Sequence, residues 1–250
     1  LALILADQIP WSQVHIIVAV FMLIGIATTW FMPEPTIAAP PPKSFKSAVV
    51  EPFREFFQRK DTKSAIGLLS FILLYKLGDN MATALATPFY LDLGFTKTEI
   101  GTVAKVAALW SSIAGGTLGG IVMIKIGINR SLWVFGFIQL ITIFGFAALS
   151  EIGPDRTWLF IVVSAEYLGV GLGTAAFVAF MAKSTDTRYT ATQLALLTSL
   201  MGVPRTIANA STGFIIASTG YTTFFMICGI LAVPGMVLLY WVAPWNEAQS

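Results

Sequence analysis

Apolar runs of about 18 residues or more recur along this 250-residue chain and limit its possible folds more than any other feature. Runs of that length are typical of helices that cross a lipid bilayer, because a helix satisfies its own backbone hydrogen bonds. Hydrophobic residues make up 56% of the chain and charged residues only 11%, far from the balance of a soluble domain. The sequence therefore predicts an all-α membrane protein that crosses the bilayer repeatedly.

The apolar runs also predict where the spans lie. Because the sequence begins at Leu1 without Met, in what resembles the tail of another span, we expect further residues before it. The predicted complete spans are residues 14–32, 64–91, 97–126, 131–149, 158–182, 192–217 and 222–242.

Residues 34–63 form the long hydrophilic stretch of the chain. Pro40, Pro41 and Pro42 predict an extended linker. Residues 48–60 then predict an amphipathic helix on the membrane surface. Its apolar residues are Val49, Pro52, Phe53, Phe56 and Phe57, and its charged residues are Glu51, Arg54, Glu55, Arg59 and Lys60.

The basic residues between spans predict the orientation of the chain. Alternate connections carry very different numbers of Lys and Arg, and the richer side is expected to be cytoplasmic, as is the C-terminus. The richer set is Lys43, Lys46, Arg54, Arg59, Lys60, Lys63, Lys125, Arg130, Lys183 and Arg188, and the opposite set is Lys97 and Arg156.

Charged residues inside the predicted spans mark the candidate functional site. They are Lys76, Asp79, Lys105, Glu166 and Arg205. A buried charge in a span costs about 2.5 to 3.5 kcal/mol on insertion scales, so it is kept where a partner or a polar cavity receives it. A helical rise of about 1.5 Å per residue places all of them at a similar depth. We therefore predict a shared polar cavity; the alternative is structural ion pairs, such as Asp79 with Lys76 and Glu166 with Arg205.

The excess of cations over carboxylates in this predicted layer favours a small anionic substrate. Lys76, Lys105 and Arg205 are the candidate anion-binding residues. Uncharged polar side chains in or beside the spans could add hydrogen bonds to a sugar or an amide. These are Tyr75, Asn80, Gln139, Tyr167 and Gln193.

The same sequence argues against an enzyme. His15 is the single histidine and stands at the edge of a span, so no Ser-His-Asp set is expected. Cys228 is the single cysteine, and neither a metal site nor a cofactor is predicted. The glycine-rich stretch from Gly169 to Ala176 lacks the spacing of a nucleotide-binding loop, and we expect it to serve close helix packing, as do Gly115, Gly116, Gly119 and Gly120.

The stretch GGIVMIKIGINR, from Gly119 to Arg130, resembles the second copy of a loop motif of the major facilitator superfamily. Gly120, Lys125, Gly127 and Arg130 match its glycine and basic positions, whereas Ile124 stands where the motif has an acidic residue. The resemblance implies that this turn acts in conformational change. It also implies the domain order: residues 1–32 end the N-terminal half, 33–63 form the linker, 64–243 form the C-terminal six-helix half, and 244–250 form a cytoplasmic tail.

Three further stretches resemble the AmpG-type anhydromuropeptide permeases within that superfamily. They are YKLGDNMATALATPFYLDLGFTKTEIGTVAK from Tyr75, AEYLGVGLGTAAFVAFM from Ala165 and YTATQLALLTSL from Tyr189. The resemblance implies multi-pass insertion in the bacterial inner membrane and import of GlcNAc-anhydroMurNAc peptides driven by the proton gradient. Such coupling needs a carboxylate that changes charge between the outward and inward states, and we expect Asp79 or Glu166 to carry the proton because both lie within spans. The resemblance further implies a monomer with no nucleic-acid partner. The alternative is a carrier for another anionic solute, such as an acyl-CoA or a sugar conjugate.

Overall fold

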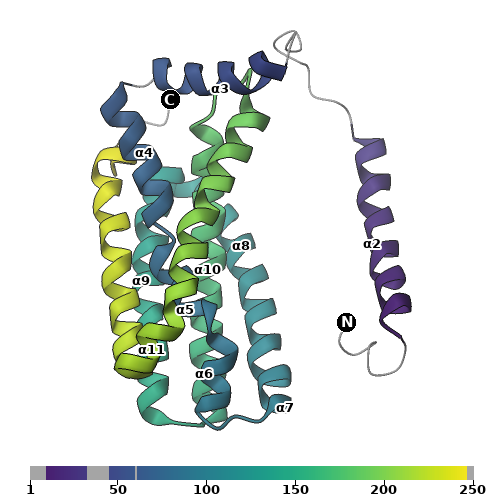
Figure 1. Cartoon of the computed structure of the whole chain (residues 1–250), viewed down its shortest axis with the longest axis vertical. Coiled ribbons are helices and arrows are strands. Elements are labelled where there is room, and N and C mark those ends of the chain that lie inside the picture. The colour runs from purple at the N-terminus through teal and green to yellow at the C-terminus, as the bar shows by residue number, and fades with distance from the viewer. Residues whose placement is uncertain (1–9, 33–44, 60, 247–250) are drawn as a thin grey trace. The chain divides into compact units, whose positions relative to one another are not determined.

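The computed structural model describes residues 10–32, 45–59 and 61–246, with backbone alone for 45–49 and Phe53. All regular structure in these ranges is helical (Figure 1). The chain divides into two compact units, Leu1–Pro41 and Pro42–Ser250, and the boundary falls within the predicted linker.

The first unit contains helix α2 (Trp11–Phe31), close to the predicted span at 14–32. Pro10 is the N-cap residue just before its first turn, with φ −59° and ψ 146°. The side chain of His15 is exposed, and its ring lies 5.9 Å from that of Trp11. The predicted tail of a preceding span and the proline linker lie outside the described residues.

The second unit is a helical bundle in which α10 packs on α8 and α9, while α11 packs on α4, α5 and α9. The predicted span boundaries are confirmed to within a few residues. The elements are α3 (Phe45–Arg59), α4 (Thr62–Leu74), α5 (Leu77–Ala84), α6 (Ala86–Asp92), α7 (Lys97–Glu99), the π-helical turn η1 (Ile100–Ala104), α8 (Lys105–Ile126), α9 (Ile128–Ile152), α10 (Arg156–Lys183) and α11 (Thr190–Val242).

Helix α11 contains the two spans predicted at 192–217 and 222–242. Its direction reverses at Gly220, where φ is +78° and ψ is 169°, a conformation that is essentially restricted to glycine. The green and yellow parts of α11 in Figure 1 accordingly run in opposite directions.

The span predicted at 64–91 is interrupted twice. Helix α4 ends at Leu74 and α5 begins at Leu77, with Lys76 at φ −101° and ψ 7° between them. A second break falls at Leu85, where φ is −112°. Pro88 explains this second break, because its ring clashes with the carbonyl four residues earlier and prevents α5 from continuing. The span is thus three short helices, α4, α5 and α6.

Glycines bring α8 and α10 into close contact, as predicted for part of the set. A Cβ added to Gly115 would lie 2.3 Å from the Leu168 carbonyl oxygen, and one added to Gly171 would lie 2.4 Å from that of Ser112. The expectation is wrong for the side-chain positions of Gly116 and Gly120, where an added Cβ would meet nothing within 4 Å. The Cβ positions of these two glycines point away from α10, although the Gly116 backbone nitrogen still lies 2.7 Å from the Cβ position of Gly171.

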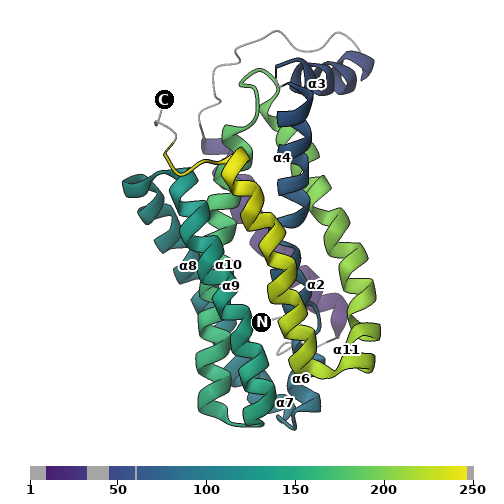
Figure 2. The same ribbon diagram turned by 90° about the vertical axis from the view of Figure 1, so that its left-hand side faces the viewer.

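Helix α3 corresponds to the amphipathic helix predicted at 48–60, and part of it also packs against the bundle. Pro52 and Phe56 are buried, and Phe56 joins an apolar cluster with Leu68 of α4 and Leu197 of α11. The exposed apolar side chains are Val50 and Phe57. Figure 2 shows α3 across the end of the bundle where α4 begins. The side chains of Val49 and Phe53 lie outside the described residues.

The turns of the second unit fall into two groups. The α8–α9 turn, the α10–α11 loop and the end of α11 lie at the end that carries α3, and the α6–α7 turn lies at the other (Figures 1 and 2). At the α6–α7 turn, Thr96 and Glu99 form a reciprocal helix cap, and Glu99 also pairs with Arg156. The described basic residues that were assigned to one side therefore share one end of the bundle.

Candidate functional site

The centre of the second unit holds a buried ion pair. The Lys76 Nζ lies 2.7 Å from Asp79 Oδ2, and the two side chains are only 8% and 7% exposed. Lys76 occupies the break between α4 and α5, and Asp79 lies in the first turn of α5. The ends of α4 and α5 favour this order, since a helix C-terminus attracts a cation and an N-terminus attracts an anion.

A second carboxyl group completes the buried charges. Glu166 of α10 is 1% exposed and interacts with the charges of Asp79 and Lys76. Neither of its oxygens makes a well-formed hydrogen bond within the described residues, and Asp79 Oδ1 is likewise unpaired there. The predicted pairing of Asp79 with Lys76 is confirmed. The alternative pairing of Glu166 with Arg205 is wrong, because Glu166 faces the Lys76–Asp79 pair instead.

The charges lie in a polar layer between two apolar clusters. One cluster includes Met81, Ile143 and Val163, and the other includes Tyr75 and Phe135. Along α4–α5, α9 and α10 the polar residues fall between members of the two clusters, so packing on both sides keeps this layer from bulk water. These polar residues are Lys76, Asp79, Gln139 and Glu166.

Gln139 and Tyr75 border the ion pair. The Tyr75 hydroxyl donates to the Leu132 carbonyl oxygen over 2.8 Å, while Gln139 Nε2 has no hydrogen-bond partner among the described residues. With Asp79 and Met236 they line a small cavity of about 10 Å³, near the volume that one water molecule requires. The structure thus brings Tyr75, Gln139 and Asp79 together.

The other uncharged candidates differ in position. Asn80 follows Asp79 on α5 and is half-buried. Tyr167 is half-buried beside Glu166 and packs against the apolar cluster that contains Tyr90. The buried Tyr90 hydroxyl, which the sequence did not single out, has no partner in the described part of the chain.

Lys105 and Arg205 lie outside the buried cluster. Lys105 is exposed at the start of α8, directly after the π-helical turn η1, and its Nζ donates to Thr87 Oγ1 over 3.0 Å. Arg205 is exposed on α11, next to the exposed Val203 and Ile207. Both cations are therefore accessible on the surface of this unit.

Gln193 lies at the end of the bundle and holds α3. Its Nε2 donates to the Pro52 carbonyl over 3.0 Å and to Glu55 Oε2 over 2.6 Å, and its Oε1 accepts from the Asp186 amide over 2.7 Å. With its amide fully engaged, Gln193 is separated from the buried charges.

The residues of the predicted loop motif lie where α8 turns into α9. Gly127 has φ +83° and ends α8, and Lys125 is exposed in its last turn. The Arg130 guanidinium lies 5.8 Å from the centroid of the Trp245 ring and donates to its carbonyl. The turn thus anchors the chain that follows α11, whereas Gly120 contributes no side-chain contact.

Thr142 and Thr87 are polar neighbours of the site that sequence reasoning missed. Thr142 lies beside Glu166 and donates to the Gln139 carbonyl over 3.0 Å. Its spacing of three residues from Gln139 was a usable signal, since such residues share a helix face. Thr87 carries no comparable signal, because only the tertiary fold brings it to Lys105.

The chemistry available at the buried site is binding of protons and ions. The two carboxyl groups and one amine give a net charge of −1 when all are ionised, and one proton makes the cluster neutral. Over the residues that the structure describes, no group of three or more His, Cys, Asp and Glu side chains could hold a metal ion.

Comparisons with known proteins point to a family of carriers. The model of the Major Facilitator Superfamily matches residues 1–208. The chain is 36% identical to the anhydromuropeptide permease of Escherichia coli K12 over 241 residues, which cover 96% of this chain and 48% of that protein. It is 34% identical to the putative transporter AmpG 4 of Rickettsia conorii over 199 residues, covering 80% of this chain and 47% of the relative.

An uncharacterised protein of Haemophilus influenzae is 48% identical over 259 residues, covering all of this chain and 61% of that protein. The chain therefore spans about half to three fifths of the length of these curated relatives. The named relatives are a permease and a transporter rather than enzymes, and the resemblance inferred from the three sequence stretches is confirmed.

Proposed function

Because this chain belongs to the Major Facilitator Superfamily, we propose that its full-length protein imports anhydromuropeptides across the bacterial inner membrane together with protons. The substrate class rests on the likeness to the anhydromuropeptide permease of Escherichia coli. The observation that carries the proton coupling is the buried Lys76, Asp79 and Glu166 cluster.

The proton count of this cluster supports the proposal. With Lys76 and Asp79 paired, an ionised Glu166 is a buried charge without its own counter-ion, which is costly in an apolar surrounding. A proton on Glu166 or Asp79 removes that charge. Taking up this proton from one side of the membrane and releasing it to the other would couple the proton gradient to the carrier's change of state.

The exposed cations are suited to binding the substrate, the second part of the proposed transport cycle. Muropeptides are anionic through their lactyl and peptide carboxylates, and charge-assisted hydrogen bonds to cations are among the stronger polar interactions. Lys105 and Arg205 are exposed on the surface of this unit and make no ion pair within the described residues, whereas Lys76 is occupied by Asp79. We therefore assign first contact with the substrate to Lys105 and Arg205, with Lys76 reached only when the ion pair opens.

The test is uptake of labelled anhydromuropeptide into right-side-out membrane vesicles that contain the full-length protein. We expect accumulation that a protonophore abolishes. Asp79→Asn or Glu166→Gln is expected to abolish accumulation against a gradient while keeping exchange of labelled for unlabelled substrate, since exchange needs no net proton movement. Glu151→Gln is the matched control, because Glu151 is an exposed carboxylate that binds Thr222 outside the cluster.

Two outcomes would contradict this proposal in different ways. If the folded protein takes up no muropeptide in either condition, another anionic solute is the substrate. If both carboxyl variants accumulate muropeptide like the parent, the proton is carried elsewhere.

The basic residues support an orientation for the carrier. We propose that the end of the bundle that carries α3 faces the cytoplasm, together with the C-terminal end of α11.

A further inference from the structure

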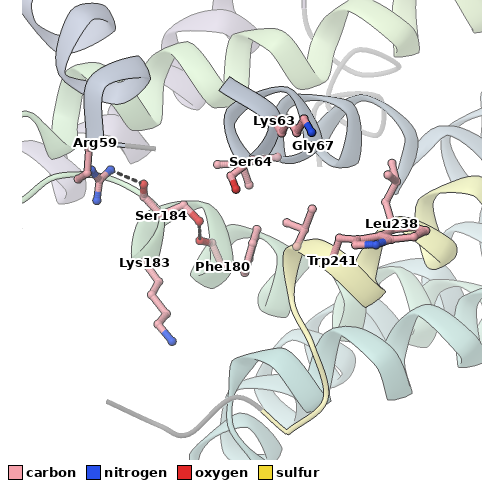
Figure 3. Close-up of a pocket in the computed structure, with 11 residues that line it drawn as sticks. Arg59, Lys63, Ser64, Gly67, Phe180, Lys183, Ser184, Leu238 and Trp241 are labelled. Carbon is pink, nitrogen blue, oxygen red and sulfur yellow. Dashed lines mark hydrogen bonds between the residues drawn. The ribbon is translucent and has the colours of Figure 1, made fainter. Parts of the chain in front are cut away.

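A basic pocket of about 690 Å³ opens at the end of the second unit that bears α3. It is lined by residues from four helices, among them Arg59 of α3, Lys63 of α4, Lys183 of α10 and Trp241 of α11. Figure 3 shows Arg59 and Lys183 on one side of this space and Trp241 and Leu238 on the other. Neither the proposed transport step nor the buried charges involve this pocket.

The pocket carries a concentrated positive charge. Its described lining contains Arg59, Lys63 and Lys183 but no Asp or Glu. Arg59 is held in place by Glu55, at 2.8 Å, and by the Ser184 carbonyl, to which it donates over 2.8 Å. Lys63 and Lys183 are exposed, and the described residues offer neither an ion-pair partner. Two cations are thus available for an anion.

The wall of the pocket continues into an exposed apolar stripe along α11. Ile230, Val233, Val237 and Trp241 are spaced three or four residues apart, so they share one helix face, and each is at least 43% exposed. Trp241 belongs both to this stripe and to the pocket lining. Tryptophan is typical of the membrane–water interface, where its ring meets apolar chains and polar headgroups together.

We propose that this pocket binds the phosphate of an anionic glycerophospholipid, whose acyl chains lie along the stripe on α11. Lys63 and Lys183 donate hydrogen bonds to the phosphate oxygens. Arg59, held by Glu55 and Ser184, forms a further part of the pocket wall. A basic pocket between membrane-spanning helices on the cytoplasmic side suits an anionic headgroup, and the proposed orientation places this one there. The apolar stripe favours a lipid over a free phosphate ion, which would leave that face unused.

The experiment counts lipids on the detergent-solubilised full-length protein by native mass spectrometry. Dioleoylphosphatidylglycerol is expected to bind at least about tenfold more tightly than dioleoylphosphatidylcholine, since each basic residue near a headgroup contributes a several-fold gain. Lys63→Gln with Lys183→Gln should abolish this preference. Lys97→Gln with Arg188→Gln removes as many charges outside the pocket and should keep it. Trp241→Ala should weaken both lipids equally, because it removes contact with chains that both share.

Each alternative result overturns the proposal. Equal binding of the two lipids by the parent, or an unchanged preference in the Lys63 and Lys183 double variant, removes the headgroup site. Inorganic phosphate that displaces the anionic lipid at equal concentration would identify a site for a soluble phosphate instead. A thermal unfolding midpoint equal to that of the parent confirms that the double variant is folded.

Discussion

Lys76 and Asp79 form an ion pair that apolar packing surrounds, so each side chain is the nearest counter-ion of the other. Breaking a buried pair by removing one partner costs about 3 to 5 kcal/mol, whereas removing both can be nearly neutral. Lys76 has a further role, because it also lies near Glu166 and offsets part of that charge.

We expect Lys76→Gln to lower the stability of the purified protein more than the double change Lys76→Gln with Asp79→Asn. The single change leaves two buried carboxyl groups without a cation, and the double change removes one of these. Unfolding in mild detergent, followed by tryptophan fluorescence, measures the difference. Additive effects of Lys76→Gln and Asp79→Asn would show that the 2.7 Å pair contributes no coupling energy.

The sequence predicted the depth of the charged residues but not which of them are buried. Depth along a helix follows from counting residues, and this placed Lys76, Asp79 and Glu166 at one level. Counting does not give the rotation of each helix about its axis, which packing decides. Lys105 and Arg205 consequently lie on exposed faces, and Gln193 holds α3 instead.

At the level of elements, the contact between α8 and α10 depends on glycines, which have no side chain to hold the two backbones apart. Gly115 lies against the Leu168 carbonyl, and its neighbour Gly116 faces open space. Adjacent positions of one helix thus differ in what a methyl group would meet, which provides a matched pair for testing how closely the two helices must approach.

We expect Gly115→Ala to destabilise the protein by about 1 to 3 kcal/mol, because the added methyl group would force α8 and α10 apart. Gly116→Ala should be neutral or stabilising by up to about 1 kcal/mol, since alanine suits a helix interior better than glycine. Thermal unfolding midpoints of the two variants in detergent test this. A loss of stability at Gly116 equal to that at Gly115 would refute the assignment of the contact face.

Helix positions were predictable to within a few residues because apolar runs and flanking charges mark the ends of spans. The interruptions were harder to place. The break at Leu85 follows from Pro88, which cannot continue the preceding helix. The break at Lys76 has no proline beside it and coincides with close packing, since a Cβ added to Gly235 would lie 2.6 Å from Tyr75 Cα.

For the whole molecule, the proposed topology follows from the ends at which the basic residues gather. Arg188 is exposed at the end that carries α3, and Lys97 is exposed at the start of α7 on the other. Cys228 is the single cysteine of the 250 residues and is buried with 0% exposure, so an introduced exposed thiol is distinguishable from it within this part of the protein.

We expect Arg188→Cys in intact cells to resist a membrane-impermeant maleimide until the membrane is permeabilised, and Lys97→Cys to react at once. The physical reason is that basic loops are retained on the cytoplasmic side. Labelling measured by gel shift, in a Cys228→Ser background, decides between the two orientations. Immediate labelling at Arg188 with protection at Lys97 would invert the topology.

The two breaks in the α4–α6 span also have a mechanical consequence. A continuous helix of this length would behave as one stiff rod, but here bending is concentrated at Lys76 and at Leu85. Between these joints α5 forms a short lever of about 12 Å that carries Asp79. Hinges absorb rotation in a few residues, so a tilt of α5 would carry Asp79 with it and would have to separate α5 from α11, where a Cβ added to Gly78 would lie 2.4 Å from the Cys228 carbonyl oxygen. The ion pair thus lies at a joint of its span, with Lys76 in the break itself and Asp79 on a short helix that packs closely against α11.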